Sequence, residues 1–350
     1  MNPQSALQAR VLRTGEDLGA IADEWSGLWH RCPDATPFQR PEWLLPWIET
    51  FSPQTITAIE VRLGNRLTGF APLLVYPRKV YRKQSDSVLA FMGGGISDYM
   101  DVIVDPEHEA QTMSSIWDAV TVLDDWGLME FTDLPAHSAI LRTPTFHDVG
   151  REHDACSALA LPSTEDELLH VLSKRQRANL RNARSRLQKA GGCSIEVAAS
   201  ETLAEFLDCL FRLHTVRWSR AGQTGVLNDE RVKTFHQRAT PLLLAQGVLR
   251  LYRLCLGSRT IAVIYSLFER GTVFCYLQGF DPEFAYYSPG TQLMFAVLQD
   301  AVRLGIKKFD FLRGQETYKQ HWRAVTEPTY CVQLARSAFR DRTPIYTRAA

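Results

Sequence analysis

Reactive side chains gather in one short stretch of the chain, residues 309–322. Phe309 and Phe311 alternate as in a strand, which leaves Asp310 on the opposite face, and Gly314 then breaks the strand. The segment after the glycine contains a carboxylate, a phenol, an amine, an imidazole and an indole. Such groups can transfer protons or hold an anion, and loops at the ends of strands are where binding groups tend to lie.

The elements that would position this stretch occur twice in the chain. An apolar stripe at helical spacing predicts a helix over 290–304, which leads into the strand that begins at Phe309. A similar helix over 107–126 leads into a strand over 129–132. The shared order predicts a duplicated α+β unit, while a chance similarity of two hairpin, helix and strand units stays open.

Two hairpin turns support the duplication, since Gly64-Asn65 and Gly257-Ser258 stand at corresponding places. The first copy has no counterpart of Tyr318, Lys319 and Trp322. We therefore expect any chemistry in the second copy and a scaffolding role for the first.

Length and composition indicate a globular protein of more than one domain. We place an N-terminal domain at 1–150, a second at 151–335 and a tail at 336–350. Basic and acidic residues balance at 39 each, which argues against a surface built for DNA. The chain shows no apolar run of membrane-spanning length and no signal peptide, so we expect a cytoplasmic protein without a transmembrane segment.

The cysteines and the glycine cluster predict no cofactor site of their own. The 7 cysteines lie far apart without a C-x-x-C pair, so we expect reduced core residues and no metal. Phe91-Met92-Gly93-Gly94-Gly95 could expose backbone N–H groups to a phosphate, but its spacing matches neither common nucleotide-binding pattern. We favour a structural turn there.

A strongly basic helix is predicted over 173–189. Seven basic residues lie between Lys174 and Lys189 without one acidic residue, and Gly191-Gly192 ends the helix. A solvated face and an anionic partner are both open, and the missing compensating charges favour the partner.

The second half of the chain, at about 165–324, resembles a known family. The resemblance is carried by Arg177-Ala178-Asn179-Leu180-Arg181, His214-x-x-Arg217-Trp218, Gly279-x-Asp281-Pro282, Ser288-Pro289-Gly290 and Gly314-x-x-x-Tyr318-Lys319-x-x-Trp322. Together these motifs resemble the GNAT-like acyltransferases found with cellulose and exopolysaccharide genes (CelD/BcsL-type, BioF2-like). The resemblance implies a mixed α+β fold of two tandem GNAT-like units, each a twisted mixed sheet flanked by helices.

The resemblance also implies an activity, the transfer of an acyl group from acyl-CoA, by default acetyl-CoA, to an amine. Amine attack on a thioester requires removal of a proton, stabilisation of the oxyanion and protonation of the leaving thiolate. Lys319 could hold the oxyanion or phosphates, Tyr318 could be the general acid, and Asp310 or Glu316 could accept the proton. The implied acceptor is an amino sugar or another polysaccharide or cell-envelope precursor.

Binding residues follow from the same resemblance. The helix that opens at Gly290 occupies the place where GNAT enzymes hold the pyrophosphate of CoA, and a helix N-terminus suits an anion. The expected glycine-rich signature is reduced here to Ser288-Pro289-Gly290-Thr291-Gln292. The candidate cofactor-binding residues are Ser288, Gly290, Thr291, Gln292 and Arg313, and the candidate substrate-binding residues are Arg177, Arg181, His214, Arg217, Trp218 and Trp322.

Two alternatives stay open. The architecture and the Tyr-Lys ending are similar to those of FemAB-type peptidyltransferases, which implies an aminoacyl-tRNA donor, with the basic helix as an anion contact. The chain could also be a non-catalytic factor in exopolysaccharide or cellulose biosynthesis.

Overall fold

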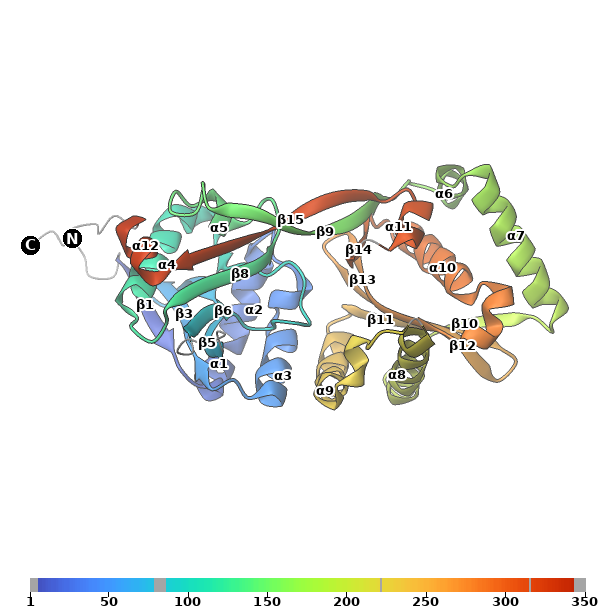
Figure 1. Cartoon of the computed structure of the whole chain (residues 1–350), viewed down its shortest axis with the longest axis horizontal. Helices are drawn as coiled ribbons and strands as arrows, with labels where there is room; N and C mark the ends of the chain where they lie inside the picture. Colours follow the sequence, from blue (N-terminus) through green and yellow to red (C-terminus); the bar gives the residue numbers. More distant parts are fainter. Residues whose placement is uncertain (1–5, 79–85, 221, 315, 343–350) are drawn as a thin grey trace, which may run out of the picture. The chain divides into compact units, whose positions relative to one another are not determined.

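The computed structural model describes residues 6–78, 86–220, 222–314 and 316–342, which fold into two compact units. The first unit comprises Met1–Asp154 and Pro328–Ala350, and the second comprises Ala155–Glu327. The chain passes into the second unit within strand β9 and returns within strand β15 (Figure 1). The second unit is therefore an insertion in the sequence of the first.

The first unit contains a mixture of helices and strands. In chain order they are β1 (Leu7–Leu12), α1 (Gly15–Ala20), α2 (Ala22–Arg31), a 3₁₀ helix (Pro37–Gln39), α3 (Pro41–Phe51), β2 (Thr55–Ile56), β3 (Ala58–Leu63), β4 (Arg66–Ala71), β5 (Leu73–Arg78), β6 (Asp86–Phe91), β7 (Ile103–Val104), a 3₁₀ helix (Pro106–His108), α4 (Glu109–Val122), β8 (Leu128–Leu134), α5 (Ala139–Arg142), the start of β9 (Gly150–Ala160), most of β15 (Val325–Ala335) and α12 (Arg336–Arg342).

Two sets of strands form the framework of this unit. One sheet has the order β1-β3-β4-β7, and in the other β15, β8, β6, β5 and β2 are neighbours in that order. In this unit, strands β6 and β8 pair in parallel. Phe339 of α12 is fully buried and packs on Trp117 and Phe146. Residues 336–342, expected in a tail, thus form a packed helix of the first unit, and 343–350 lie outside the described residues.

The second unit is built around one mixed sheet. Its elements are the rest of β9, α6 (Glu165–Val171), α7 (Lys174–Lys189), β10 (Cys193–Val197), α8 (Leu203–Arg220), a 3₁₀ helix (Val226–Asn228), α9 (Glu230–Ala245), β11 (Leu249–Leu256), β12 (Arg259–Glu269), β13 (Thr272–Phe280), a 3₁₀ helix (Pro282–Tyr287), α10 (Pro289–Arg303), β14 (Lys308–Arg313), α11 (Thr317–His321) and the start of β15.

Helices cover both faces of this sheet, whose order is β10-β11-β12-β13-β14-β9. Helices α7 and α10 lie over one face, and α8 and α9 lie over the other (Figure 1). Leu293 and Val297 of α10 join Leu187 of α7 and Phe309 of β14 in the core between the helices and the sheet. The predicted mixed α+β fold with helix-flanked sheets is confirmed.

The two units repeat one arrangement of strands. Helix α4 precedes β8, which is parallel to β6, and helix α10 precedes β14, which is parallel to β13. Both predicted hairpin turns form, with positive φ angles of 59° at Gly64 and 58° at Gly257. The Gly93–Gly95 segment is a turn, in which Gly93 O accepts hydrogen bonds from Ile96 N and Ser97 N.

Strand β9 lies within residues 144–162, and helix α8 continues to Arg220, so His214, Arg217 and Trp218 are helical. The expectation for the cysteines needs correction. The cysteines are free, but Cys193 is exposed and only part of the set belongs to the core. Within the described residues no helix is both long and apolar enough to cross a bilayer.

Gly279 of β13 is required by close packing, which gives a testable prediction. A Cβ atom at this position would lie 2.6 Å from His214 N and 2.7 Å from Leu213 C, both backbone atoms of α8. Because a helix backbone cannot move aside cheaply, we expect Gly279→Ala to lower the free energy of unfolding by about 1–3 kcal/mol in urea denaturation.

The matched control is Gly19→Ala in α1, where the new Cβ meets no atom within 4 Å. That variant should be neutral or slightly stabilising because alanine favours helix. Equal stability of Gly279→Ala and the unmodified protein would contradict the packing argument.

Candidate functional site

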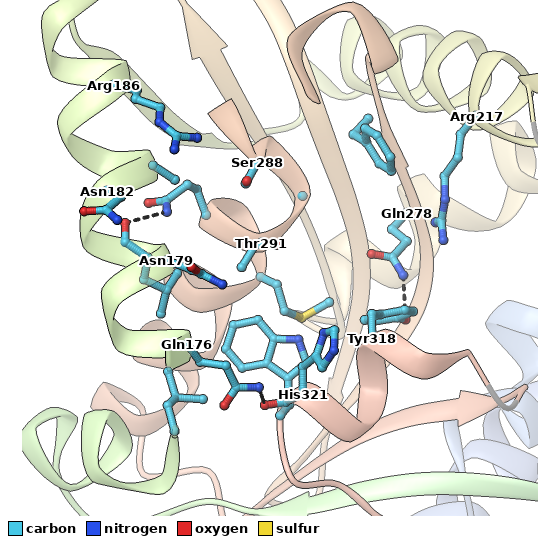
Figure 2. A pocket seen from close by; sticks show the side chains of 18 residues that line it. Gln176, Asn179, Asn182, Arg186, Arg217, Gln278, Ser288, Thr291, Tyr318 and His321 are labelled. Carbon is cyan, nitrogen blue, oxygen red and sulfur yellow. Dashed lines mark hydrogen bonds between the residues drawn. The ribbon is translucent and has the colours of Figure 1, made fainter. Parts of the chain in front are cut away.

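A cavity of about 520 Å³ lies in the second unit between α7, the start of α10, the end of β13 and α11 (Figure 2). Its volume is in the range of ordinary ligand pockets, about 300–1,000 Å³. Leu172, Leu180, Phe280, Met294 and Trp322 supply apolar surface. The remaining lining is polar or basic, and none of the described residues that line the cavity is Asp or Glu.

One face of α7 forms a polar wall. Gln176, Asn179, Asn182 and Arg186 follow each other at spacings of three, three and four residues, and all four line the cavity. The Arg186 guanidinium donates to Tyr286 O at 2.7 Å and stacks on the Tyr286 ring at 4.5 Å. This face of α7 presents three side-chain amides and one guanidinium to the cavity. The spacing of these residues is visible in the sequence, but the sequence-based prediction for this helix rested on its basic residues alone.

The N-terminus of α10 opens onto the same cavity. Ser288 precedes the helix in the left-handed region (φ 50°) and its side chain makes no capping hydrogen bond. Pro289 has no N–H, and the first intrahelical bond runs from Gln292 N to Ser288 O. The N–H groups of Gly290 and Thr291 therefore have no acceptor among the described residues, and both residues line the cavity.

Four of the predicted cofactor residues, Ser288, Gly290, Thr291 and Gln292, are thus brought together at the cavity. Gln292 is partly committed, since its Nε2 donates to Leu180 O at 3.0 Å and links α10 to α7. The fifth, Arg313, is not among the residues that line the cavity.

Tyr318 and Gln278 lie next to each other in the lining of the cavity. Gln278 Nε2 donates to Tyr318 Oη at 2.5 Å (Figure 2). Burial raises the pKa of the Tyr318 phenol well above its usual range, with Cys275 and Glu316 adding to the effect. Because its oxygen accepts from the amide, the hydroxyl proton of Tyr318 can be donated to another group.

Arg217 and His321 complete the polar lining. The Arg217 guanidinium lies 5.7 Å from the centre of the Phe280 ring and has no carboxylate partner in the described part of the chain. His321, on α11, is exposed and lines the cavity, and its carbonyl accepts from Gln176 Nε2. Gln278 and His321 were given no role on the basis of sequence.

Lys319 does not line the cavity. Its side chain is 97 % buried, and its ammonium donates to Leu312 O at 3.0 Å, Arg313 O at 2.6 Å and Gly314 O at 2.9 Å. Glu316 Oε2 lies 2.9 Å from the same nitrogen. All three ammonium protons thus have acceptors within the turn that follows β14, so Lys319 holds this turn and is not free to bind an oxyanion.

The two carboxylates proposed as proton acceptors also lie outside the cavity lining. Asp310 is fully buried and its Oδ1 accepts from Leu312 N at 2.8 Å, which stabilises the strand exit. Glu316 is engaged with Lys319. Both side chains therefore stabilise the segment that carries Tyr318 and do not contact the cavity.

The predicted substrate residues separate into two groups. Arg217 and Trp322 line the cavity, whereas Arg177, Arg181, His214 and Trp218 do not. Arg177 donates to the carbonyls of Leu169 and Leu172 at the end of α6, and Arg181 is exposed.

His214 is buried on α8, behind Gly279, with its ring 5.8 Å from that of Trp218. Its Nδ1 has no hydrogen-bond partner among the described residues. Burial lowers the pKa of His214 to about 4, and Arg217 adds to the effect.

Comparisons with known proteins identify the domain. Residues 174–320 match the family model described as an acetyltransferase (GNAT) domain, and this range includes all the residues that line the cavity except Leu172, His321 and Trp322. Residues 174–320 form a GNAT acetyltransferase domain. The predicted family resemblance is confirmed for this segment. No curated protein sequence matches the chain significantly.

Solved structures share the fold of both units. FemX superposes with a TM-score of 0.66 at 12% identity, with 96% of this chain and 100% of FemX covered. The C-terminal domain of a putative lysylphosphatidylglycerol synthetase from Agrobacterium fabrum gives 0.53 at 10% identity, covering 91% and 92%. L-PGS from Bacillus licheniformis gives 0.50 at 13% identity, covering 80% and 87%. At these identities the likeness concerns the fold alone.

The buried imidazole behind the GNAT cavity predicts a pH dependence of stability. In the unfolded chain His214 takes up a proton near pH 6.5, whereas in the folded chain it stays neutral down to about pH 4. Stability from this group is therefore complete above pH 6.5 and decreases as the pH falls towards 4, by at most about 3 kcal/mol.

Urea denaturation at pH 7 and pH 4.5 measures this effect. We expect His214→Leu to lose less stability between the two pH values than the unmodified protein. If both proteins lose the same amount, His214 does not titrate as described.

Proposed function

We propose that the GNAT domain is an acyl-CoA-dependent N-acyltransferase and that its cavity holds the acyl-CoA donor. The observation that carries the proposal is the cavity's charge. Arg186 and Arg217 line the cavity, and none of the described lining residues is acidic. The backbone N–H groups of Gly290 and Thr291 have no hydrogen-bond acceptor among the described residues. Such a lining suits a bound anion with an extended, partly apolar body.

The pyrophosphate of CoA would lie at the start of α10. The helix is 15 residues long, so its N-terminus carries a partial positive charge. A Cβ atom at Gly290 would meet only Phe280 at 3.6 Å, so packing does not require glycine there. We infer that glycine keeps this backbone accessible to the phosphates, with Arg186 as the neighbouring cation.

Tyr318 is the candidate general acid. Its phenol stays protonated at neutral pH because burial raises its pKa, and Gln278 orients it. In the reaction the amine nitrogen attacks the thioester carbon, the carbon–sulfur bond breaks, and Tyr318 donates its proton to the leaving thiolate.

His321 is the candidate acceptor for the amine proton, in place of Asp310 and Glu316. It carries the one imidazole among the described residues that line the cavity. An imidazole suits proton transfer near neutral pH. The acceptor amine, whether an amino sugar or a cell-envelope precursor, is a proposal that rests on the family resemblance alone.

Replacement of the phenol tests the general acid. We expect Tyr318→Phe to lower kcat for thiol release from acyl-CoA by about 10² or more, with little change in KM for acyl-CoA, because only the proton donor is lost. Tyr287→Phe is the control, since Tyr287 does not line the cavity. An unchanged kcat in Tyr318→Phe would exclude the role, provided that thermal denaturation shows both variants folded.

A second candidate function is aminoacyl transfer from tRNA, which one observation favours. Five basic residues of α7 are exposed and have no carboxylate partner in the described part of the chain: Lys174, Arg175, Arg181, Arg184 and Lys189. An unpaired row of cations on one helix is the electrostatic pattern of a polyanion contact.

Two sets of variants distinguish the donors in titrations with CoA and with tRNA. For a CoA donor, Arg186→Gln should weaken CoA binding about tenfold or more, because a charge-assisted contact is lost, whereas the Arg181→Gln/Arg184→Gln double variant should bind CoA normally. For a tRNA donor, the double variant should weaken tRNA binding and reduce its dependence on salt. Absence of CoA binding together with salt-sensitive tRNA binding would reverse our preference.

A further inference from the structure

Tyr286 is an aromatic residue on the surface of the second unit. It belongs to the 3₁₀ helix Pro282–Tyr287 that precedes α10, and it is 66 % exposed. The next residue, Tyr287, packs against the core of the unit, so the two neighbouring phenol rings differ in their surroundings. Packing in the core therefore accounts for the ring at 287 but not for the ring at 286.

Contacts with Arg186 and Tyr287 restrain this exposed ring. The Arg186 guanidinium donates to Tyr286 O at 2.7 Å and lies 4.5 Å from the centre of the Tyr286 ring. The Tyr287 ring meets it edge to face, at 78° and 5.3 Å between the ring centres. An aromatic ring that is already ordered but still exposed loses little conformational freedom when a flat ligand stacks on it.

The Tyr286 ring stands beside the proposed pyrophosphate site. Arg186, over which the ring lies, lines the cavity, and so does Ser288, two residues after Tyr286. Arg186 and Ser288 lie in the same part of the cavity lining (Figure 2). A group attached to phosphates at the start of α10 can therefore reach the exposed ring as it leaves the cavity.

The chemistry of the site indicates which group this is. An aromatic ring next to an arginine is a surface on which nucleobases stack, because every base has a flat π face and the guanidinium adds a cationic contact. In CoA an adenosine is joined directly to the pyrophosphate, so its base follows the phosphates along the ligand. In a tRNA donor the bases of the 3′ end likewise lie next to phosphates.

We propose that Tyr286, restrained by Arg186, is the stacking platform for a nucleobase of the donor. It would favour a donor that carries a nucleotide over the same thiol arm without one. This inference rests on the proposed function, because the phosphate site at α10 determines where the nucleotide lies. The base would take the exposed surface of the Tyr286 ring, while Arg186 contacts the ring and the neighbouring phosphate.

Calorimetric titrations of the full chain test the platform with two ligands, CoA and 4′-phosphopantetheine, which has the thiol arm but no adenosine. Tyr286→Leu should weaken CoA binding by about fivefold or more, the lower end of the range for loss of one base–aromatic stack, and leave 4′-phosphopantetheine binding unchanged. The substitution carries little risk to folding because the side chain is exposed.

Two further variants separate the ring from other effects of the substitution. Tyr286→Phe keeps the aromatic face and should retain the CoA affinity of the unmodified protein. Tyr76→Leu is the matched control, since it makes the same substitution at an exposed tyrosine of the first unit that does not line the donor cavity. It should bind both ligands normally.

The outcomes distinguish this inference from the proposed function. Equal CoA affinity in Tyr286→Leu and the unmodified protein would refute the platform and leave the acyl-CoA donor standing. Equal weakening of both ligands would also refute it, because the ring would then act on the phosphate site and not on a base.

Absence of CoA binding in the unmodified protein would overturn the proposed donor. The same variants are then titrated with an RNA minihelix that ends in CCA. Weakening by about fivefold or more in Tyr286→Leu, with normal binding in Tyr286→Phe, would support the platform for a tRNA donor. Equal affinity of Tyr286→Leu and the unmodified protein, or no binding of the minihelix, would refute it.

Discussion

The buried ammonium of Lys319 is the interaction on which the candidate site depends. It ties together three successive carbonyls, Leu312 to Gly314, directly after β14. Leu312 adopts a left-handed conformation there (φ 58°), which a branched apolar side chain rarely adopts without external constraint. The same ammonium makes the turn into α11 rigid, and α11 presents Tyr318 and His321 to the cavity. Lys319 therefore supports the candidate site through the backbone of this turn and not by lining the cavity.

Local patterns in the sequence were sufficient for most elements around the site. The apolar stripe of α10, the alternation in β14, the hairpin at Gly257 and the basic helix α7 all depend on neighbours within a few residues, which is the range that periodicity reads. Strands β9 and β15 were not predicted from the sequence, because the strands with which they pair are remote in sequence. Pro328 inside β15 further weakens any strand pattern there.

Site membership was harder to predict than secondary structure. Tyr318, Lys319, Asp310 and Glu316 look equally reactive in sequence, and only the fold separates Tyr318, in the cavity, from the other three, which support the turn. The contribution of Gln278 to the site depends on the packing of β13 beside α11, which the sequence does not indicate. By contrast, the spacing of Gln176, Asn179 and Asn182 in the sequence places them on one face of α7. This polar face was not predicted because the basic residues around it dominated the interpretation of the helix.

The insertion of the second unit within the first has a consequence for synthesis on the ribosome. All of 155–327 is translated before Pro328–Ala335 of β15 and helix α12, so the first unit lacks an edge strand and the buried Phe339 until these last described elements have been made. The first unit, whose N-terminal part is translated first, is therefore completed only with the last described residues of the chain. During that interval the exposed flank of β8 is an unpaired strand edge, the kind of surface that invites misassociation.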